Sequence, residues 1–138
     1  MDDFIYSTIE EARAAQAAGD YPYGSVLVRG GEIVARGRNH VNTQNDPTSH
    51  AEADVLRVAG LQASYADTVM YASAFPCIMC AGAIIFLGVP EVIVGTTWEG
   101  YESSRALLEA HGVKLTILEL DECKQLLVGP DVPLSDSR

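Results

Sequence analysis

The sequence predicts an α/β fold built on a mixed sheet. Two observations lead to this prediction: a short hairpin pattern lies early in the chain, and the later strand patterns alternate with helices long enough to connect parallel strands. The 138 residues are expected to form one domain, 1–138, because no repeat, low-complexity stretch or linker divides them. A chain of this size buries about 68–70% of its unfolded surface, which is enough for a core of its own.

The first part of the chain is expected to hold one helix and one hairpin. Apolar residues at helical spacing predict the helix, and Asp2 or Asp3 is a suitable cap for its start. The Gly30-Gly31 pair separates two short strand patterns and is typical of a tight hairpin turn. In order, we expect a helix ending near Gly19, strands at 25–29 and 32–36, and a polar loop at 39–48.

The remainder of the chain alternates helix and strand patterns. Pro76 suits a helix start, where a missing N–H costs nothing, and Gly88 followed by Pro90 is typical of a helix end. The spacer before the last strand contains a helix, so the last two strands are expected to run parallel. We expect helices at 49–59, from Pro76 or Cys77 to near Gly88, at 101–110 and at 121–128, strands at 68–74, 91–95 and 113–118, and an irregular tail from residue 129. The apolar run 81–87 is expected to be a buried helix.

Two short motifs carry the chemistry: His-Ala-Glu at 50–52 and Pro-Cys-Ile-Met-Cys at 76–80. Zinc binds histidine nitrogen and cysteine thiolate, so His50, Cys77 and Cys80 are the expected ligands of one zinc ion per chain. Three protein ligands leave a position for water, which is typical of a catalytic site, and zinc lowers the pKa of that water to about 7. Glu52 is expected to carry protons. This order of residues is the signature of zinc-dependent base deaminases.

The spacing of the two motifs is compatible with one shared site. Cys77 and Cys80 are three residues apart and therefore lie on one face of a helix. Ligand sites in such sheets form at the carboxyl ends of parallel strands, and Cys77 follows one of these ends. His50 also lies at an expected helix start. We therefore expect two helix N-termini, each the positive end of a helix dipole, to face one metal.

Each motif also has an ordinary structural interpretation. Ser49 and Glu52 could form a capping box, in which Glu52 only bonds the backbone, and a lone histidine on a helix usually packs. The cysteine pair alone could be a redox pair or half of a structural zinc site. A zinc-stabilised binding module without catalysis would need a fourth ligand, and Cys123, His40 and His111 are the spare candidates. We expect Cys123 to be a small packed residue. The joint occurrence of the motifs in this order favours the catalytic site.

Charge and hydropathy restrict the partners. The net charge is −10, and the nine basic residues are scattered, whereas nucleic-acid binders normally show a basic patch. We therefore expect a small heterocyclic base as substrate and no nucleic acid. No apolar run reaches the length of about 20 residues that spans a membrane, and the start of the chain lacks a signal-peptide pattern. Two metal-binding cysteines among three favour a reducing compartment, so the expected location is the cytoplasm.

The chain resembles the cytidine deaminase-like superfamily over about Pro22 to Cys123, with the greatest likeness to fungal-type cytosine deaminases and bacterial nucleobase deaminases. The resemblance rests on these segments: Pro22-Tyr23-Gly24, Gly37-Arg38-Asn39, Thr48-Ser49-His50-Ala51-Glu52, Pro76-Cys77-Ile78-Met79-Cys80 with Ala81-Gly82-Ala83-Ile84-Ile85, and Val94-Gly95. It implies a three-layer α/β/α fold with a five-stranded mixed sheet flanked by helices, and a homodimer. It also implies that His50, Cys77 and Cys80 hold zinc and that Glu52 shuttles protons.

The resemblance further implies four substrate-binding residues. Asn39, eleven residues before His50, would hydrogen-bond the polar edge of the substrate, although a turn residue after a strand is an equal alternative. Ala51 would offer its backbone N–H to the ring. Phe75 stands where relatives carry Ser or Glu and would form an apolar wall. Trp98 lies where relatives place an aromatic lid and would stack on the substrate, unless it is simply packed in the core. The same two alternatives apply to Tyr101 and Tyr23.

These features predict release of ammonia from an amino-substituted ring carbon of a small heterocycle. Cytosine, converted to uracil, is the favoured substrate, with guanine or another amino-azaheterocycle as the alternative. The tRNA adenosine deaminases also carry the His-Ala-Glu motif, but the excess of acidic over basic residues in this chain is unfavourable for binding RNA. Fungal cytosine deaminases have a longer C-terminal segment that closes over the base, and here Asp131 or Asp136 could reach the site.

Overall fold

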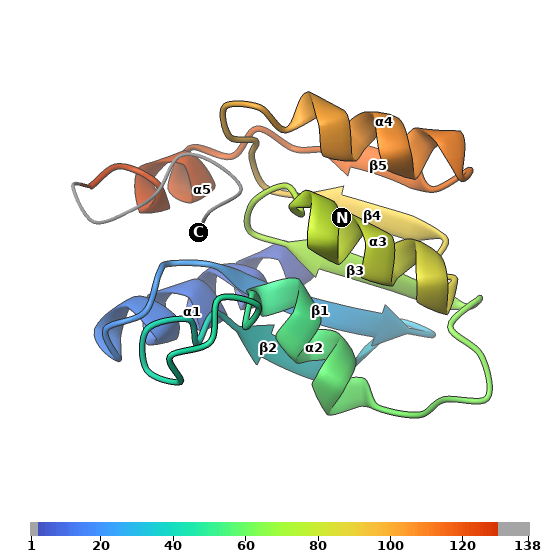
Figure 1. The fold of residues 1–138 in the computed structure, drawn as a ribbon, viewed down its shortest axis with the longest axis horizontal. Helices are drawn as coiled ribbons and strands as arrows, with labels where there is room; N and C mark the ends of the chain where they lie inside the picture. The colour runs from blue at the N-terminus through green and yellow to red at the C-terminus, as the bar shows by residue number, and fades with distance from the viewer. Residues whose placement is uncertain (1–2, 130–138) are drawn as a thin grey trace.

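A computed structural model describes residues 3–129 as a five-stranded sheet between two layers of helices (Figure 1). The strand order is β2-β1-β3-β4-β5, which confirms the predicted α/β fold with a mixed sheet. The elements in chain order are α1 (Phe4–Ala17), β1 (Gly24–Arg29), β2 (Glu32–Arg38), α2 (Ala51–Ala59), β3 (Thr68–Ala72), α3 (Ile78–Leu87), β4 (Glu91–Val94), α4 (Glu102–Ala110), β5 (Lys114–Ile117) and α5 (Asp121–Leu126).

The sheet changes direction at β1. Strands β1 and β2 form the predicted antiparallel hairpin, and their turn needs Gly30 and Gly31 because both have positive φ angles, 58° and 77°. Strand β1 also pairs with β3 in the antiparallel sense, whereas β3, β4 and β5 are parallel. The expected parallel pairing of the last two strands is therefore confirmed. The carboxyl ends of these three strands lie at one edge, where α/β proteins place their sites.

Alternate residues of β1 separate the two halves of the core. Leu27 packs with Met70 in the cluster that α2, α3 and α4 cover. The neighbouring Val26 points to the other face, where it packs with Ile5 of α1 and Tyr71. Figure 1 shows α2, α3 and α4 in front of the sheet and α1 behind it. This period-2 alternation in a strand covered on both faces produces the three-layer arrangement.

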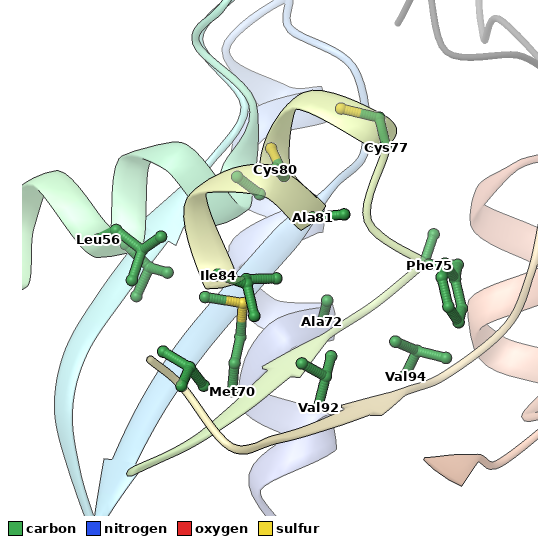
Figure 2. Close-up of a cluster of buried hydrophobic side chains, with 14 of the residues drawn as sticks. Leu56, Met70, Ala72, Phe75, Cys77, Cys80, Ala81, Ile84, Val92 and Val94 are labelled. Atoms are coloured by element: carbon green, nitrogen blue, oxygen red, sulfur yellow. The ribbon is translucent and has the colours of Figure 1, made fainter. Parts of the chain in front are cut away.

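Helix α3 packs on the sheet with only one side. Figure 2 shows Ile84 pointing from α3 toward Met70, and Ala81 is also buried on this helix. The far side is exposed, and Phe86 is 87% exposed to solvent. The prediction that the apolar run 81–87 is buried was therefore wrong for Phe86, because an all-apolar helix gives no sequence signal for which side faces the core.

Several element boundaries differ from the predictions by one or two residues. Helix α2 begins at Ala51 with His50 as its N-cap, and β3 ends at Ala72. Asp3 is the N-cap of α1 but its side chain makes no capping hydrogen bond. The predictions for Asp2, Asp131 and Asp136 concern residues outside 3–129. Within the described residues, none of the helices has the length and apolar character to cross a membrane.

Candidate metal centre and active site

The candidate metal ligands lie at the starts of two helices. His50 is the N-cap residue of α2, and Cys77 is the N-cap residue of α3; both have extended backbone angles. The chain enters α2 from the 39–48 loop and α3 from the end of β3, so the two helix starts meet above the sheet. The Nδ1 of His50 lies 3.2 Å from the Cys77 Sγ and 3.9 Å from the Cys80 Sγ. The expected convergence of two helix N-termini is confirmed.

The three ligand atoms have the separation that zinc requires. Tetrahedral zinc with typical Zn–N and Zn–S bonds places nitrogen and sulfur ligands about 3.6 Å apart. The His50, Cys77 and Cys80 ligand atoms all lie within 4.8 Å of one another, and all three residues are buried. Among residues 3–129, no further His, Cys, Asp or Glu joins this group. The donor set therefore fits one zinc ion with an open position.

The three spare ligand candidates lie elsewhere. His40 contacts the carboxylate of Asp54, and the exposed His111 directs its Nδ1 to the Leu107 carbonyl oxygen at 3.0 Å. Cys123 is buried on α5. A closed four-ligand structural site thus has no support in the described part of the chain.

The site favours thiolate at Cys77. Its hydrogen bond with Cys80, followed by the one with His50, lowers the pKa of the Cys77 thiol from 9.0 to about 3, against the opposing effect of burial. The start of α3 adds its positive dipole end at the same place. Thiolate is the form that binds zinc, so this environment suits a metal ligand.

Glu52 and Ala51 occupy the first turn of α2, directly after His50. Glu52 is only 3% exposed, so it lies inside the protein, two residues after the ligand histidine. The alternative that Ser49 and Glu52 form a capping box was wrong, because His50 is the N-cap and α2 has no side-chain capping bond. The backbone N–H of Ala51, as a first-turn group, has no acceptor within the helix.

A close approach between β2 and α2 brings the chain at Asn39 next to the start of α2. A Cβ atom at Gly37 would overlap the backbone of Val55, so only glycine allows α2 to lie this close to β2. Just beyond β2, the His40 N–H donates to the Ser49 carbonyl oxygen at 2.9 Å. This bond joins the chain next to Asn39 with the chain next to His50.

In the side-chain amide of Asn39, the oxygen has a hydrogen-bond partner and the nitrogen has none. Asn39 is 1% exposed, and its Oδ1 accepts the N–H of Val41 at 3.0 Å. Its Nδ2 is buried and has no hydrogen-bond partner. A buried donor without a partner is costly, which points to a group that the protein binds there.

The two aromatic candidates pack together at the carboxyl ends of β3 and β4. The indole N–H of Trp98 donates to the Phe75 carbonyl oxygen at 2.6 Å, and the Phe75 ring lies 5.2 Å from that of Tyr101. Phe75 is fully buried and Trp98 is 6% exposed. In Figure 2, the Phe75 ring lies near Val94 and away from Cys77. Direct contact of Phe75 or Trp98 with a substrate stays a prediction.

Two buried carboxylates near the site were not foreseen. Asp20 accepts the backbone N–H groups of Asn42 and Thr43 and so fixes the 39–48 loop. Asp54, on α2, accepts the Arg38 N–H at 3.0 Å. Neither position carries a sequence signal, because an acidic residue after a helix or on a helix is most often a solvent-exposed one.

Comparisons with known proteins agree with this site. Residues 2–96 match the family described as the cytidine and deoxycytidylate deaminase zinc-binding region. Guanine deaminase of Bacillus subtilis (strain 168) is 47% identical over 66 residues, which are 46% of this chain and only 42% of that protein. A tRNA-specific adenosine deaminase of Buchnera aphidicola subsp. Schizaphis graminum is 31% identical over 129 residues, 86% of this chain and 85% of that protein.

A solved structure gives the same result for the fold. It comes from a study of A-to-I editing by tRNA:A34 deaminases, is 30% identical, and has a TM-score of 0.81 over 90% of this chain and 98% of that chain. The zinc motifs, the order of the five strands and the family match over most of the length all indicate the same family. The chain therefore belongs to the cytidine and deoxycytidylate deaminase zinc-binding family, and it is a zinc-dependent hydrolytic deaminase.

Proposed function

We propose that this deaminase acts on a free amino-substituted nucleobase, with guanine as the first candidate and cytosine as the alternative. The observation that carries the proposal is the unpartnered, buried Nδ2 of Asn39, on a segment that the His40 N–H joins to the chain just before the ligand histidine. The sequence motifs favoured cytosine, but the relatives described above are named for guanine and for adenosine in tRNA. The preference for cytosine therefore stays a prediction.

The orientation of Asn39 restricts the substrate. Because Oδ1 accepts the Val41 N–H, the atom left for a ligand is the donor Nδ2. Guanine and cytosine each carry a ring carbonyl oxygen that accepts such a bond. Adenine has no carbonyl oxygen and could offer only a ring nitrogen. The donor thus supports an oxo-substituted base over adenine.

The charge distribution supports a free base over tRNA. Every lysine and arginine among residues 3–129 forms an ion pair with a carboxylate of the same chain. A phosphate backbone would have to displace these carboxylates while the chain as a whole carries a net charge of −10. An uncharged small molecule meets neither obstacle.

Each site residue has a role in the proposed reaction. His50, Cys77 and Cys80 would hold zinc, which when bound supplies a water activated for attack on the amino-bearing ring carbon. Asn39 and the backbone N–H of Ala51 orient the ring. Glu52 takes one proton from the attacking water and passes it to the adjacent ring nitrogen. It then takes the second proton from the new hydroxyl group on the ring carbon and gives it to the amino group. The carbon–nitrogen bond breaks, ammonia leaves, and the ring keeps the water oxygen.

Ammonia release tests the substrate. Zinc-loaded protein should release ammonia from guanine and, in second place, from cytosine, with isocytosine, cytidine, adenine and amino-triazines as further compounds. A tRNA anticodon stem-loop with adenosine at the wobble position is the matched nucleic-acid substrate. Conversion of that stem-loop without turnover of any free base would overturn the proposal. Turnover of adenine above guanine and cytosine would contradict the role given to Asn39.

We also propose that two copies associate through the outer side of α3. Ile78, Met79 and Phe86 are exposed there, and no residue of this helix is charged. Two copies with a net charge of −10 each can meet at this uncharged side without bringing carboxylates together. Light scattering should show a dimer for the wild type and a monomer for Phe86→Glu. A wild-type monomer at micromolar concentration would rule the dimer out.

A further inference from the structure

Asp54 contacts both neighbours of Asn39. It lies on α2, four residues after His50, and its carboxylate is 6% exposed. One oxygen, Oδ2, accepts the backbone N–H of Arg38 at 3.0 Å and lies 3.4 Å from the Nε2 of His40. A single oxygen atom thus holds the residues before and after Asn39.

The other oxygen of Asp54 is bound separately. Its Oδ1 lies 2.6 Å from the Nη2 of Arg57, an exposed residue one turn further along α2. This pair compensates the buried charge and involves Oδ1, whereas the contacts with Arg38 and His40 involve Oδ2. The two oxygens can therefore be tested independently, one through Arg57 and one through the segment around Asn39.

We propose that Asp54 is a positioning residue that holds Asn39 in register with His50 and Glu52. The helix that carries the metal ligand and the proton carrier also carries Asp54, so the carboxylate connects the two halves of the site. The position of Asn39 follows from three fixed points: Asp54 holds Arg38 and His40, and the His40 N–H donates to the Ser49 carbonyl oxygen. The inference rests on the proposed role of Asn39 in binding the base.

The first test compares steady-state kinetics of zinc-loaded variants. Asp54→Ala should lower kcat/KM by about tenfold, mainly through KM, because a displaced donor loses the strength of about one hydrogen bond. Zinc content should stay that of the wild type. Asp54→Asn keeps an acceptor for the Arg38 N–H and should recover part of the loss. Arg57→Gln, which removes only the partner of Oδ1, is the matched control and should change KM by less than about twofold.

A double-mutant cycle tests whether Asp54 acts through Asn39. If it does, adding Asp54→Ala to Asn39→Ala should lower kcat/KM no further than Asn39→Ala alone, within about twofold. A purely structural role predicts that the two losses multiply. Multiplicative losses, or an unchanged KM in Asp54→Ala, would overturn the inference.

Amide hydrogen exchange tests the same point without a substrate. The Val41 N–H donates to the Oδ1 of Asn39, so its exchange rate reports the orientation of that amide. Asp54→Ala should speed Val41 exchange by about tenfold, and Arg57→Gln should leave it unchanged. Equal Val41 rates in wild type and Asp54→Ala would refute the positioning role. If no free base is turned over while Val41 responds as expected, the proposed function fails and the positioning of Asn39 stands.

Discussion

Two buried cysteines of this chain have opposite chemistry. Cys77 is 2% exposed and Cys123 is 1% exposed, so burial does not distinguish them. Hydrogen bonds with Cys80 and His50 lower the pKa of Cys77 to about 3, whereas burial raises the pKa of Cys123 to about 11. The surroundings of Cys77 favour a metal-binding thiolate, whereas those of Cys123 favour a neutral thiol in an apolar core.

The difference lies in what surrounds each sulfur. Cys77 stands where the starts of α2 and α3 converge, and His50 and Cys80 reach the same point. Cys123 packs on α5 among Ile9, Ala12 and Leu126. The two helix N-termini and the neighbouring ligand residues make Cys77 reactive. Burial without such neighbours makes Cys123 a small hydrophobic residue.

The largest expected difference between the two cysteines is in the zinc content after each thiol is removed. Cys77→Ala is expected to lower zinc from about one ion per chain to near zero, because two remaining ligands hold zinc poorly. Cys123→Ala should keep the full metal content. Metal analysis of both purified proteins measures the effect. A Cys77→Ala protein that still holds one tightly bound zinc would contradict the ligand set.

Glu52 separates metal binding from catalysis within the same site. Glu52→Gln keeps the shape of the side chain but cannot carry a proton, so turnover should fall by about 10²- to 10⁴-fold. Zinc content should be unchanged, because Glu52 is not in the ligand group. Ammonia release and metal analysis on the same preparation give both values. Wild-type turnover in this variant would show that another group moves the protons.

The metal site could be predicted because its information is local. The residues of each motif are adjacent or three apart, and the strand before Cys77 places that motif at the carboxyl end of the sheet. The contact of Asp54 with Arg38 depends instead on the approach of α2 to β2, which Gly37 permits and which no local pattern reveals. The exposure of Phe86 was missed for the same reason: it depends on what covers α3, and an all-apolar helix does not indicate its inner side.

The packing around Cys123 can be tested at Gly95, which lies against it. A Cβ atom at Gly95 would overlap the Cys123 Sγ and would lie 2.9 Å from the Ser73 carbonyl oxygen. Gly95→Ala should therefore lower the free energy of unfolding by about 1–3 kcal/mol, measured by urea denaturation. Cys123→Gly should recover part of this loss when combined with it. If the two changes are simply additive, the contact between Gly95 and Cys123 does not limit packing there.

The smallest expected effect is a pH dependence carried by Cys123. Its pKa is raised from 9.0 to about 11 in the folded protein, so the unfolded chain releases the proton first as pH rises. The folded state then binds more protons, and the free energy of unfolding must fall between pH 9 and pH 11. In Cys123→Ala this contribution is absent, so the wild type should lose up to about 2 kcal/mol more than the variant over that range. Urea denaturation at both pH values measures the difference, and the other groups that titrate there cancel because both proteins share them. Parallel losses in the two proteins would mean that Cys123 ionises with an ordinary pKa, and the contrast with Cys77 would then rest on the metal site alone.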